Sequence, residues 1–249
     1  MLNVAGRILL ELGSTRRSVL FWALFPALML LLFGLIYAEG GSTGHSFDRT
    51  APGILIGAAL FFSCLGGPIT VLVGERERHT LKRVLLSPLP PTRYFLGVFL
   101  AFCVIAAVQT VVVYGIAFAF GAAFHGSLPL GVAIVGLSVL AYVTLGFYFG
   151  ARFARTTEEV NGPLAALGVP LLVLGGTFFD PSILPPYLMA AARLDPIFHM
   201  NEALKAVSAE GAGWRAVGDH LAVLAGFALF AALVGLRAYR RLLREEGGS

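Results

Sequence analysis

Six long apolar segments, separated by shorter polar stretches, dominate the pattern of hydrophobic and polar positions along this chain. A helix needs about 20 predominantly apolar residues to cross the hydrocarbon core of a bilayer. Because each segment is near or above that length, the pattern predicts an all-α integral membrane protein with six transmembrane helices and a single transmembrane domain over residues 1–249. The expected spans cover residues 18–38, 51–73, 94–124, 128–151, 162–179 and 220–238.

The first apolar segment follows Arg16 and Arg17 and has the outline of a secretory signal peptide. Its apolar run from Ser18 to Ala38 is longer than the roughly 7–15 residues of a signal-peptide core. We therefore interpret it as a retained first span, with cleavage near Ala38 as the alternative.

Residues 3–14 precede the first span and show helical periodicity. The spacing predicts a short amphipathic helix at the inner membrane surface, and a polar start to the first span is the alternative. The polar face would hold Asn3, Arg7 and Glu11, and the apolar face Val4, Ile8, Leu9 and Leu12.

Lysine and arginine lie mostly on one side of the predicted membrane. Fourteen of the 18 basic residues fall in the termini or in loops on the same side as the termini. Cytoplasmic loops carry such an excess, so we expect a multi-pass protein of the inner (plasma) membrane with both termini in the cytoplasm. Because these charges are spread over span ends, the sequence disfavours nucleic acid as a partner.

None of the fourteen acidic residues lies inside a predicted span. Ion-coupled carriers generally need an ionisable group at membrane depth, so a secondary transporter or a channel is the less favoured class. Gln109 is the main polar residue of the third span. We expect it to form an interhelical hydrogen bond, with substrate contact as the alternative.

Motifs for catalysis are absent from the sequence. It contains neither a G-x-x-x-x-G-K-[ST] phosphate-binding loop nor a G-x-S-x-G elbow, and its five histidines lack the H-E-x-x-H spacing of a zinc site. We therefore expect a protein that is not an enzyme, without catalytic residues, a metal site or a cofactor of its own. Cys64 and Cys103, each in the middle of a span, are expected to be packing residues.

The loop from Gly74 to Arg93 is the most charged part of the chain. Its pattern predicts a cytoplasmic helix that begins at Glu75, with acidic residues in its first turn, and ends at Ser87. An apolar stripe along this helix is typical of a docking surface, and a charge cluster that only sets topology is the alternative. The predicted docking residues are Glu75, Arg76, Glu77, Arg78, Thr80, Leu81, Val84 and Leu85.

Small residues crowd the fifth predicted span, and prolines interrupt the segment that follows it. Small side chains let helices approach closely, so we expect part of the interface between two copies of the chain here, through Gly168 and Gly175, with an interface on the first span as the alternative. The segment from Asp180 to Asp219 is too apolar for a free loop, which predicts two short re-entrant or interfacial helices on the outer side. Its prolines are Pro181, Pro185, Pro186 and Pro196.

Two groups of residues resemble motifs of the membrane subunits of type-2 ABC exporters, the ABC-2 permease family. The family has a cytoplasmic E-x-E-x-G-T-L pattern followed by leucines and Ser-Pro, and a G-x-F-x-P…L-P…P pattern after the fifth span. His79 stands where the family often has glycine, and Tyr187 where an aromatic residue is expected. The matching residues are Glu75, Glu77, Thr80, Leu81, Leu85, Leu86, Ser87 and Pro88 in the first motif, and Gly176, Phe178, Pro181, Leu184, Pro185 and Pro196 in the second.

The resemblance implies a permease subunit of an ATP-driven exporter. A separate ABC ATPase subunit would bind ATP and Mg and would seat the 75–87 segment as a coupling helix. A second permease copy or a paralogue would complete the export path within the membrane lipid, largely along the first, second and fifth spans. The candidate path residues are Phe25, Phe33, Phe61, Phe62, Phe178 and Phe179.

The substrate class is expected from the composition of the spans and loops. Spans rich in Phe, Gly and Ala, joined by small external loops, favour an amphiphilic or apolar substrate such as a drug, an antibiotic or a lipid. A lipid-linked glycopolymer is the alternative, because its exporters share the architecture.

Overall fold

The computed structural model describes residues 2–14, 16–39, 41–78, 91–153, 156 and 158–247, and these residues form helices without any strand. The helices in chain order are α1 (Leu2–Ser14), α2 (Arg16–Ala38), α3 (Thr43–Gly53), the π-helix η1 (Ile54–Leu65), α4 (Gly66–Glu77), α6 (Pro91–Ala119), α7 (Leu128–Arg152), α8 (Glu158–Leu174), the short 3₁₀-helix η2 (Pro181–Ile183), α9 (Pro186–Ala192), α10 (Pro196–Ser208) and α11 (Gly218–Gly247). The prediction of an all-α protein is confirmed.

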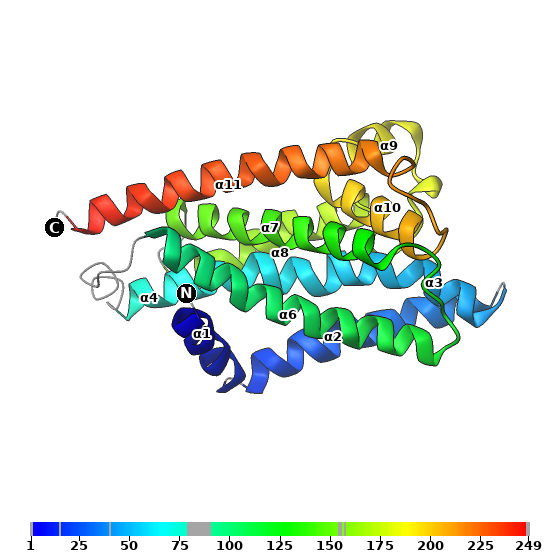
Figure 1. Ribbon diagram of the computed structural model, residues 1–249, viewed down its shortest axis with the longest axis horizontal. Coiled ribbons are helices and arrows are strands. Elements are labelled where there is room, and N and C mark those ends of the chain that lie inside the picture. The colour runs from blue at the N-terminus through cyan, green and yellow to red at the C-terminus, as the bar shows by residue number, and fades with distance from the viewer. Residues whose placement is uncertain are drawn as a thin grey trace.

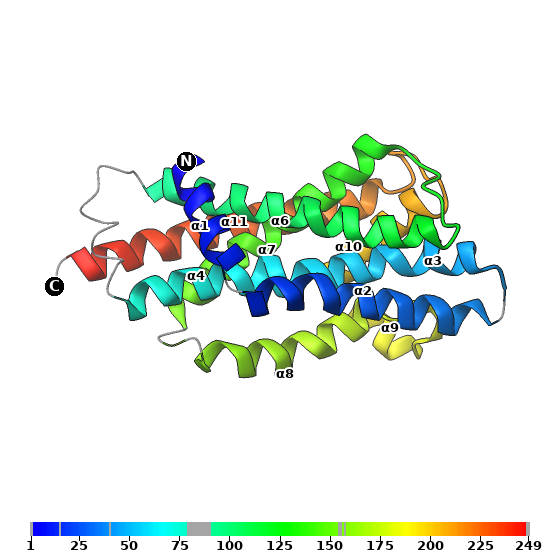
Figure 2. The same ribbon diagram turned by 90° about the horizontal axis from the view of Figure 1, so that it is seen from below.

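The long helices run side by side along one axis, and α1 crosses that axis at one end of the bundle (Figure 1). This end also holds the last turn of α4 and the C-terminus, whereas α9 and α10 lie at the opposite end. Figure 2 shows α8 at the edge of the bundle. Both termini therefore lie at one end, as the charge pattern predicts, and the assignment of that end to the cytoplasm stays a prediction.

Within the described part of the chain, five helical stretches are long and apolar enough to cross a membrane, namely 20–38, 43–77, 92–119, 128–152 and 218–241. The segment predicted as a fifth span over 162–179 is helical only as far as Leu174, and its apolar stretch, Leu164–Leu174, is shorter than a full crossing. Gly176 has a positive φ of 74°, a conformation that ends helices and that glycine adopts without strain. The count of six spans stays a prediction.

The second predicted span is the central helix of the fold and is longer than expected. Helices α3, η1 and α4 form one continuous helix over residues 43–77, where the pattern predicted 51–73. In its most apolar window 78% of the residues are buried, against 17% in α2 and 22% in α11. At Gly66 the π-helix continues as an α-helix without a break.

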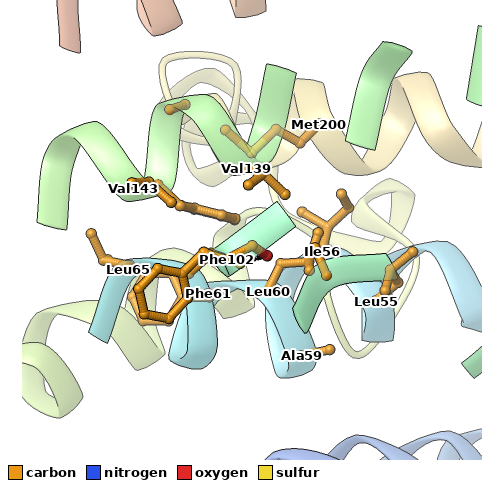
Figure 3. Close-up of a cluster of buried hydrophobic side chains, with 14 of the residues drawn as sticks. Leu55, Ile56, Ala59, Leu60, Phe61, Leu65, Phe102, Val139, Val143 and Met200 are labelled. Carbon is orange, nitrogen blue, oxygen red and sulfur yellow. Dashed lines mark hydrogen bonds between the residues drawn. The ribbon is translucent and has the colours of Figure 1, made fainter. Parts of the chain in front are cut away.

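The hydrophobic core surrounds this central helix. Buried side chains of η1 meet those of α6, α7 and α10 in the close-up of Figure 3. Close contact requires small residues, because a Cβ added at Gly67 would lie 2.3 Å from the Phe102 ring. The labelled core residues are Leu55, Ile56, Ala59, Leu60, Phe61, Leu65, Phe102, Val139, Val143 and Met200.

The amphipathic helix predicted before the first span is confirmed as α1. Val4, Ala5 and Ile8 are buried and α1 packs mainly on α6, while Arg7 and Glu11 form ion pairs at the end of α4. The apolar face thus lies against the bundle, which excludes the alternative of a polar start to the first span. Its contact with a membrane surface stays a prediction.

The predicted end of the third span is wrong. Helix α6 ends at Ala119 instead of residue 124, because Gly121 takes a positive φ of 87° and turns the chain.

In the segment from Asp180 to Asp219 the prolines begin helices instead of breaking them. Pro181, Pro186 and Pro196 occupy first turns, where a missing N–H costs nothing, so η2, α9 and α10 follow one another.

Candidate functional site

The first predicted docking residues form the last turn of the central helix. Glu75, Arg76 and Glu77 end α4, and Arg78 follows as its C-terminal cap. The prediction of a new helix that begins at Glu75 is therefore wrong. Glu and Arg are good helix formers, so the change from apolar to charged residues after Val73 marks the end of the apolar surface and not the end of the helix. The dipole argument for acidic residues at a helix start does not apply here.

Glu75 joins three helices at this end of the bundle. Its carboxylate is buried, forms an ion pair with Arg7 of α1 and accepts a 2.7 Å hydrogen bond from the Tyr94 hydroxyl of α6. Burial alone would lower the pKa of the Arg7 guanidinium, but the attraction of Glu75 raises it overall. The Tyr94 ring stacks on Tyr239 of α11, with centroids 5.6 Å apart, which extends the cluster to a fourth helix.

Arg76 and Arg78, which follow Glu75, contact other helices at this end of the bundle. Arg76 donates to the Ala151 carbonyl at the end of α7 over 3.2 Å, and Arg78 forms an ion pair with Glu11 of α1. Glu77 is exposed. The remaining predicted docking residues, Thr80, Leu81, Val84 and Leu85, lie outside the described residues, so docking of the 75–87 segment stays a prediction.

The candidate path residues fall into two groups along α2. Phe25 meets Phe62 edge-on at 5.7 Å, and Phe62 meets Phe61 at 5.3 Å. Nearer the outer end, Phe33 lies 5.3 Å from Phe178. Phe21, one turn before Phe25, stacks on it at 5.2 Å. The sequence prediction missed Phe21, although its i, i+4 spacing from Phe25 is the signal that could have found it.

Phe179, the sixth candidate path residue, lines a cavity of about 410 Å³ together with Phe178. There Asp180 accepts from Arg49 over 2.7 Å and lies 3.5 Å from Lys205. Burial alone would raise the pKa of the Asp180 carboxyl, but hydrogen bonds from Ser182 and the charges of Lys205 and Arg49 hold it below its usual range. The charged side chains of Asp180, Arg49 and Lys205 in this cavity are thus already paired with one another.

Gln109 forms the predicted interhelical hydrogen bonds. Its Oε1 accepts from the Ser63 hydroxyl of η1 over 2.8 Å, and its Nε2 donates to the Trp22 carbonyl of α2 over 3.0 Å. These bonds tie α6 to the central helix and to α2. Such a bond satisfies the polar groups of Gln109 at membrane depth.

Gly168 and Gly175 face their own chain. A Cβ added at Gly168 would lie 2.6 Å from the Phe61 ring, and one at Gly175 would lie 2.7 Å from Ile197. The prediction that these two glycines meet a second copy is therefore wrong, because their small size lets α8 approach η1 and α10. On the same helix Gly162, Ala165 and Ala166 are exposed.

A second and larger cavity, of about 550 Å³, lies between η1, α7, α8, α10 and α11. Its size is within the range of small-molecule sites. Apart from Phe61, no residue predicted for the path lines it. Its walls include Phe61, Tyr142, Phe149, Leu167, Met200 and Asp195.

Comparison with known proteins identifies the architecture. The family model described as ABC-2 family transporter protein matches residues 41–237. The chain is 25% identical over 172 residues to the probable multidrug ABC transporter permease YbhR of Escherichia coli strain K12, covering 69% of this chain and 46% of that protein. It is 26% identical over 223 residues to the daunorubicin resistance ABC transporter permease protein DrrB1 of Streptomyces coeruleorubidus, covering 87% and 77%. The chain thus spans about half the length of the Escherichia coli relative.

Proposed function

Because this chain belongs to the ABC-2 family of transporter proteins, we propose that it is the permease subunit of an ATP-driven exporter that moves an amphiphilic or apolar substrate outward. The family match carries this proposal, since it extends from just before α3 into α11 and includes the central helix. The names of the relatives favour a drug or an antibiotic over a lipid-linked glycopolymer.

A separate ATPase subunit supplies the driving force in this proposal. ATP and Mg bind to that partner, and a second permease copy or a paralogue completes the path. The contacts of Glu75 support a coupling role for this end of the bundle, because the first residue of the 75–87 segment thereby links α1, α4 and α6. A push on that segment would reach the central helix at its last turn.

The substrate path runs along α2 and the central helix in this proposal. This path is supported by the aromatic contacts of Phe25 with Phe62 and of Phe33 with Phe178, which bring candidate lining residues together at two points along α2. Aromatic rings offer large apolar surfaces without fixed hydrogen-bond demands, which suits an amphiphilic cargo.

Transport into inside-out membrane vesicles tests the proposal. Vesicles that contain this chain and its cognate ATPase should accumulate a fluorescent amphiphile when ATP and Mg are added. Vesicles in which the ATPase carries an inactivated phosphate-binding lysine should not. ATP-independent accumulation, or accumulation that follows an imposed ion gradient, would contradict an ATP-driven exporter.

A further inference from the structure

Asp195 places a carboxylate in the wall of the 550 Å³ cavity. It caps the start of α10, where Oδ1 accepts from the Ile197 backbone N–H over 2.9 Å. The side chain is 5% exposed, and its second oxygen, Oδ2, has no hydrogen-bond partner within the described part of the chain. A buried carboxylate oxygen without a partner is costly, so it calls for a functional explanation.

Tyr142 of α7 lines the same cavity. Its hydroxyl, like Asp195 Oδ2, is buried and has no hydrogen-bond partner among the described residues. Two side chains with unpaired polar atoms, from separate elements, thus belong to the wall of one cavity.

Apart from Glu159 of α8, the rest of the wall is apolar and aromatic. Phe61, Phe149 and Phe227 contribute rings, and Leu167 and Met200 contribute aliphatic surface. Ring faces attract cations, and the aliphatic groups favour an apolar body. No lysine, arginine or histidine from the described residues lines the cavity, so the lining itself supplies no counter-charge for Asp195.

We propose that this cavity binds a monovalent organic cation with a large apolar body, whose charged group meets Asp195 Oδ2 and the Tyr142 hydroxyl. The inference rests on the proposed function, because it names lipophilic cations as the substrate class of the exporter. A cation at this position satisfies the unpaired oxygen with a charge-assisted contact, and its apolar groups fill the aromatic part of the cavity. Neutral and anionic amphiphiles of equal size lack that contact.

Binding of two near-isosteric ions to the purified full-length chain in lipid nanodiscs tests the charge preference. Tetraphenylphosphonium and tetraphenylborate have nearly the same shape and opposite charge. The wild-type chain should bind the cation roughly tenfold or more tightly than the anion. Equal affinities, or a preference for the anion, would overturn the proposal.

The variant Asp195→Asn assigns the preference to this carboxylate. Asparagine keeps an oxygen that caps α10, so the helix start is retained while the charge is removed. Cation affinity should fall roughly tenfold, and anion affinity should not fall. Tyr142→Phe should lower the affinity for the cation by a smaller factor. Asp180→Asn is the matched control, since Asp180 caps η2 in the same way but does not line this cavity. The Asp180→Asn variant should bind the cation with the affinity of the wild type.

Failure of this inference and failure of the proposed function give different results. ATP-dependent export without cation preference, or a preference that survives Asp195→Asn, would overturn the cation site and leave the exporter intact. Selective cation binding without ATP-dependent export would retain the site and contradict the exporter. Melting curves of each variant, measured in the same nanodiscs, separate lost binding from lost folding.

Discussion

At the scale of single residues, the buried carboxylates of Glu75 and Asp195 differ in what surrounds them. Glu75 has Arg7 and the Tyr94 hydroxyl as partners, whereas Asp195 keeps one oxygen unpaired next to an apolar cavity. Paired buried charges stabilise an arrangement of helices, and their removal is costly. An unpaired one is suited to a charged ligand. The two residues therefore lead to different predictions.

Replacing Glu75 by glutamine should destabilise the end of the bundle where α1, α4 and α6 meet. The change keeps the side-chain volume but removes the charge that attracts Arg7 and weakens the acceptor for Tyr94. Hydrogen bonds to charged groups contribute about 2 kcal/mol each, so the melting temperature of the purified chain should fall by several degrees. Glu77→Gln, at an exposed position two residues later, should melt like the wild type. Equal melting temperatures for both variants would contradict the role of Glu75.

Binding of tetraphenylphosphonium should depend on pH through Asp195. Burial raises the pKa of this carboxyl to about 6, against the opposing effect of the Ile197 hydrogen bond. The carboxyl is therefore mostly ionised at neutral pH and becomes neutral as the pH falls through about 6, so affinity for this permanently charged cation should fall in the same range.

The same titration in Asp195→Asn identifies the group responsible. Glu159 of α8 and Tyr142 of α7 are the other titratable residues that line the cavity among those described, and the tyrosine stays neutral in this range. A flat pH profile in the variant is expected. An unchanged drop in affinity near pH 6 in the variant would contradict the assignment to Asp195.

At the scale of elements, helix α8 shows how a small residue can serve its own chain. Gly168 lets α8 approach Phe61, which in turn packs edge-on against Tyr142 at 5.8 Å. A pattern of small residues indicates a close helix contact without saying which helix is the partner. The sequence therefore predicted the contact correctly but assigned it to a second copy.

Replacing Gly168 by alanine should weaken the fold without changing the oligomeric state. The new Cβ would lie 2.6 Å from the Phe61 ring, and overpacking of this kind costs about 1–3 kcal/mol. Gly162→Ala, where nothing lies within 4 Å, should be neutral or stabilising by up to about 1 kcal/mol. Melting curves and native mass spectrometry check both variants. A shift from dimer to monomer at an unchanged melting temperature would instead support the prediction that Gly168 lies at a contact between two copies.

Helix identity could be predicted from the sequence more reliably than helix ends. Long apolar runs predict the spans because burial in lipid or protein makes the same demand on every residue of the run. The end of the second span was wrong because Glu75 to Glu77 continue a helix whose surface turns polar. The end of the third was wrong because a positive φ at Gly121 is one of many conformations that glycine allows.

At the scale of the whole molecule, the cavity was beyond the reach of the sequence. Its wall combines residues as distant as Phe61 and Phe227, and no linear spacing brings them together. Asp195 carries no sequence signal beyond that of a helix cap before Pro196. Only the fold shows that its carboxylate is buried beside apolar walls.

The continuous central helix connects the proposed coupling end to this cavity. It runs over residues 43–77 without a break, with Glu75 in its last turn and Phe61 in the cavity wall. A rigid helix transmits a displacement at one end to contacts along its length. In the proposed mechanism, α4 and η1 therefore connect the ATPase to the cavity.

Changes in the 75–87 segment should consequently uncouple ATP hydrolysis from export. We expect Glu77→Lys, at an exposed position, and Leu85→Asp, outside the described residues, to abolish export while membrane insertion stays intact. Loss of an interfacial charge or apolar anchor costs about 2 kcal/mol or more, which corresponds to roughly thirtyfold weaker docking. Glu210→Lys is the matched charge reversal, because Glu210 is exposed and belongs to the segment between α10 and α11, which lies at the other end of the bundle (Figure 1). Substrate-stimulated ATPase activity and export, measured with the cognate ATPase, should be lost in the first two variants and kept in the third. Wild-type coupling in both Glu77→Lys and Leu85→Asp would mean that this segment only sets the topology of the chain.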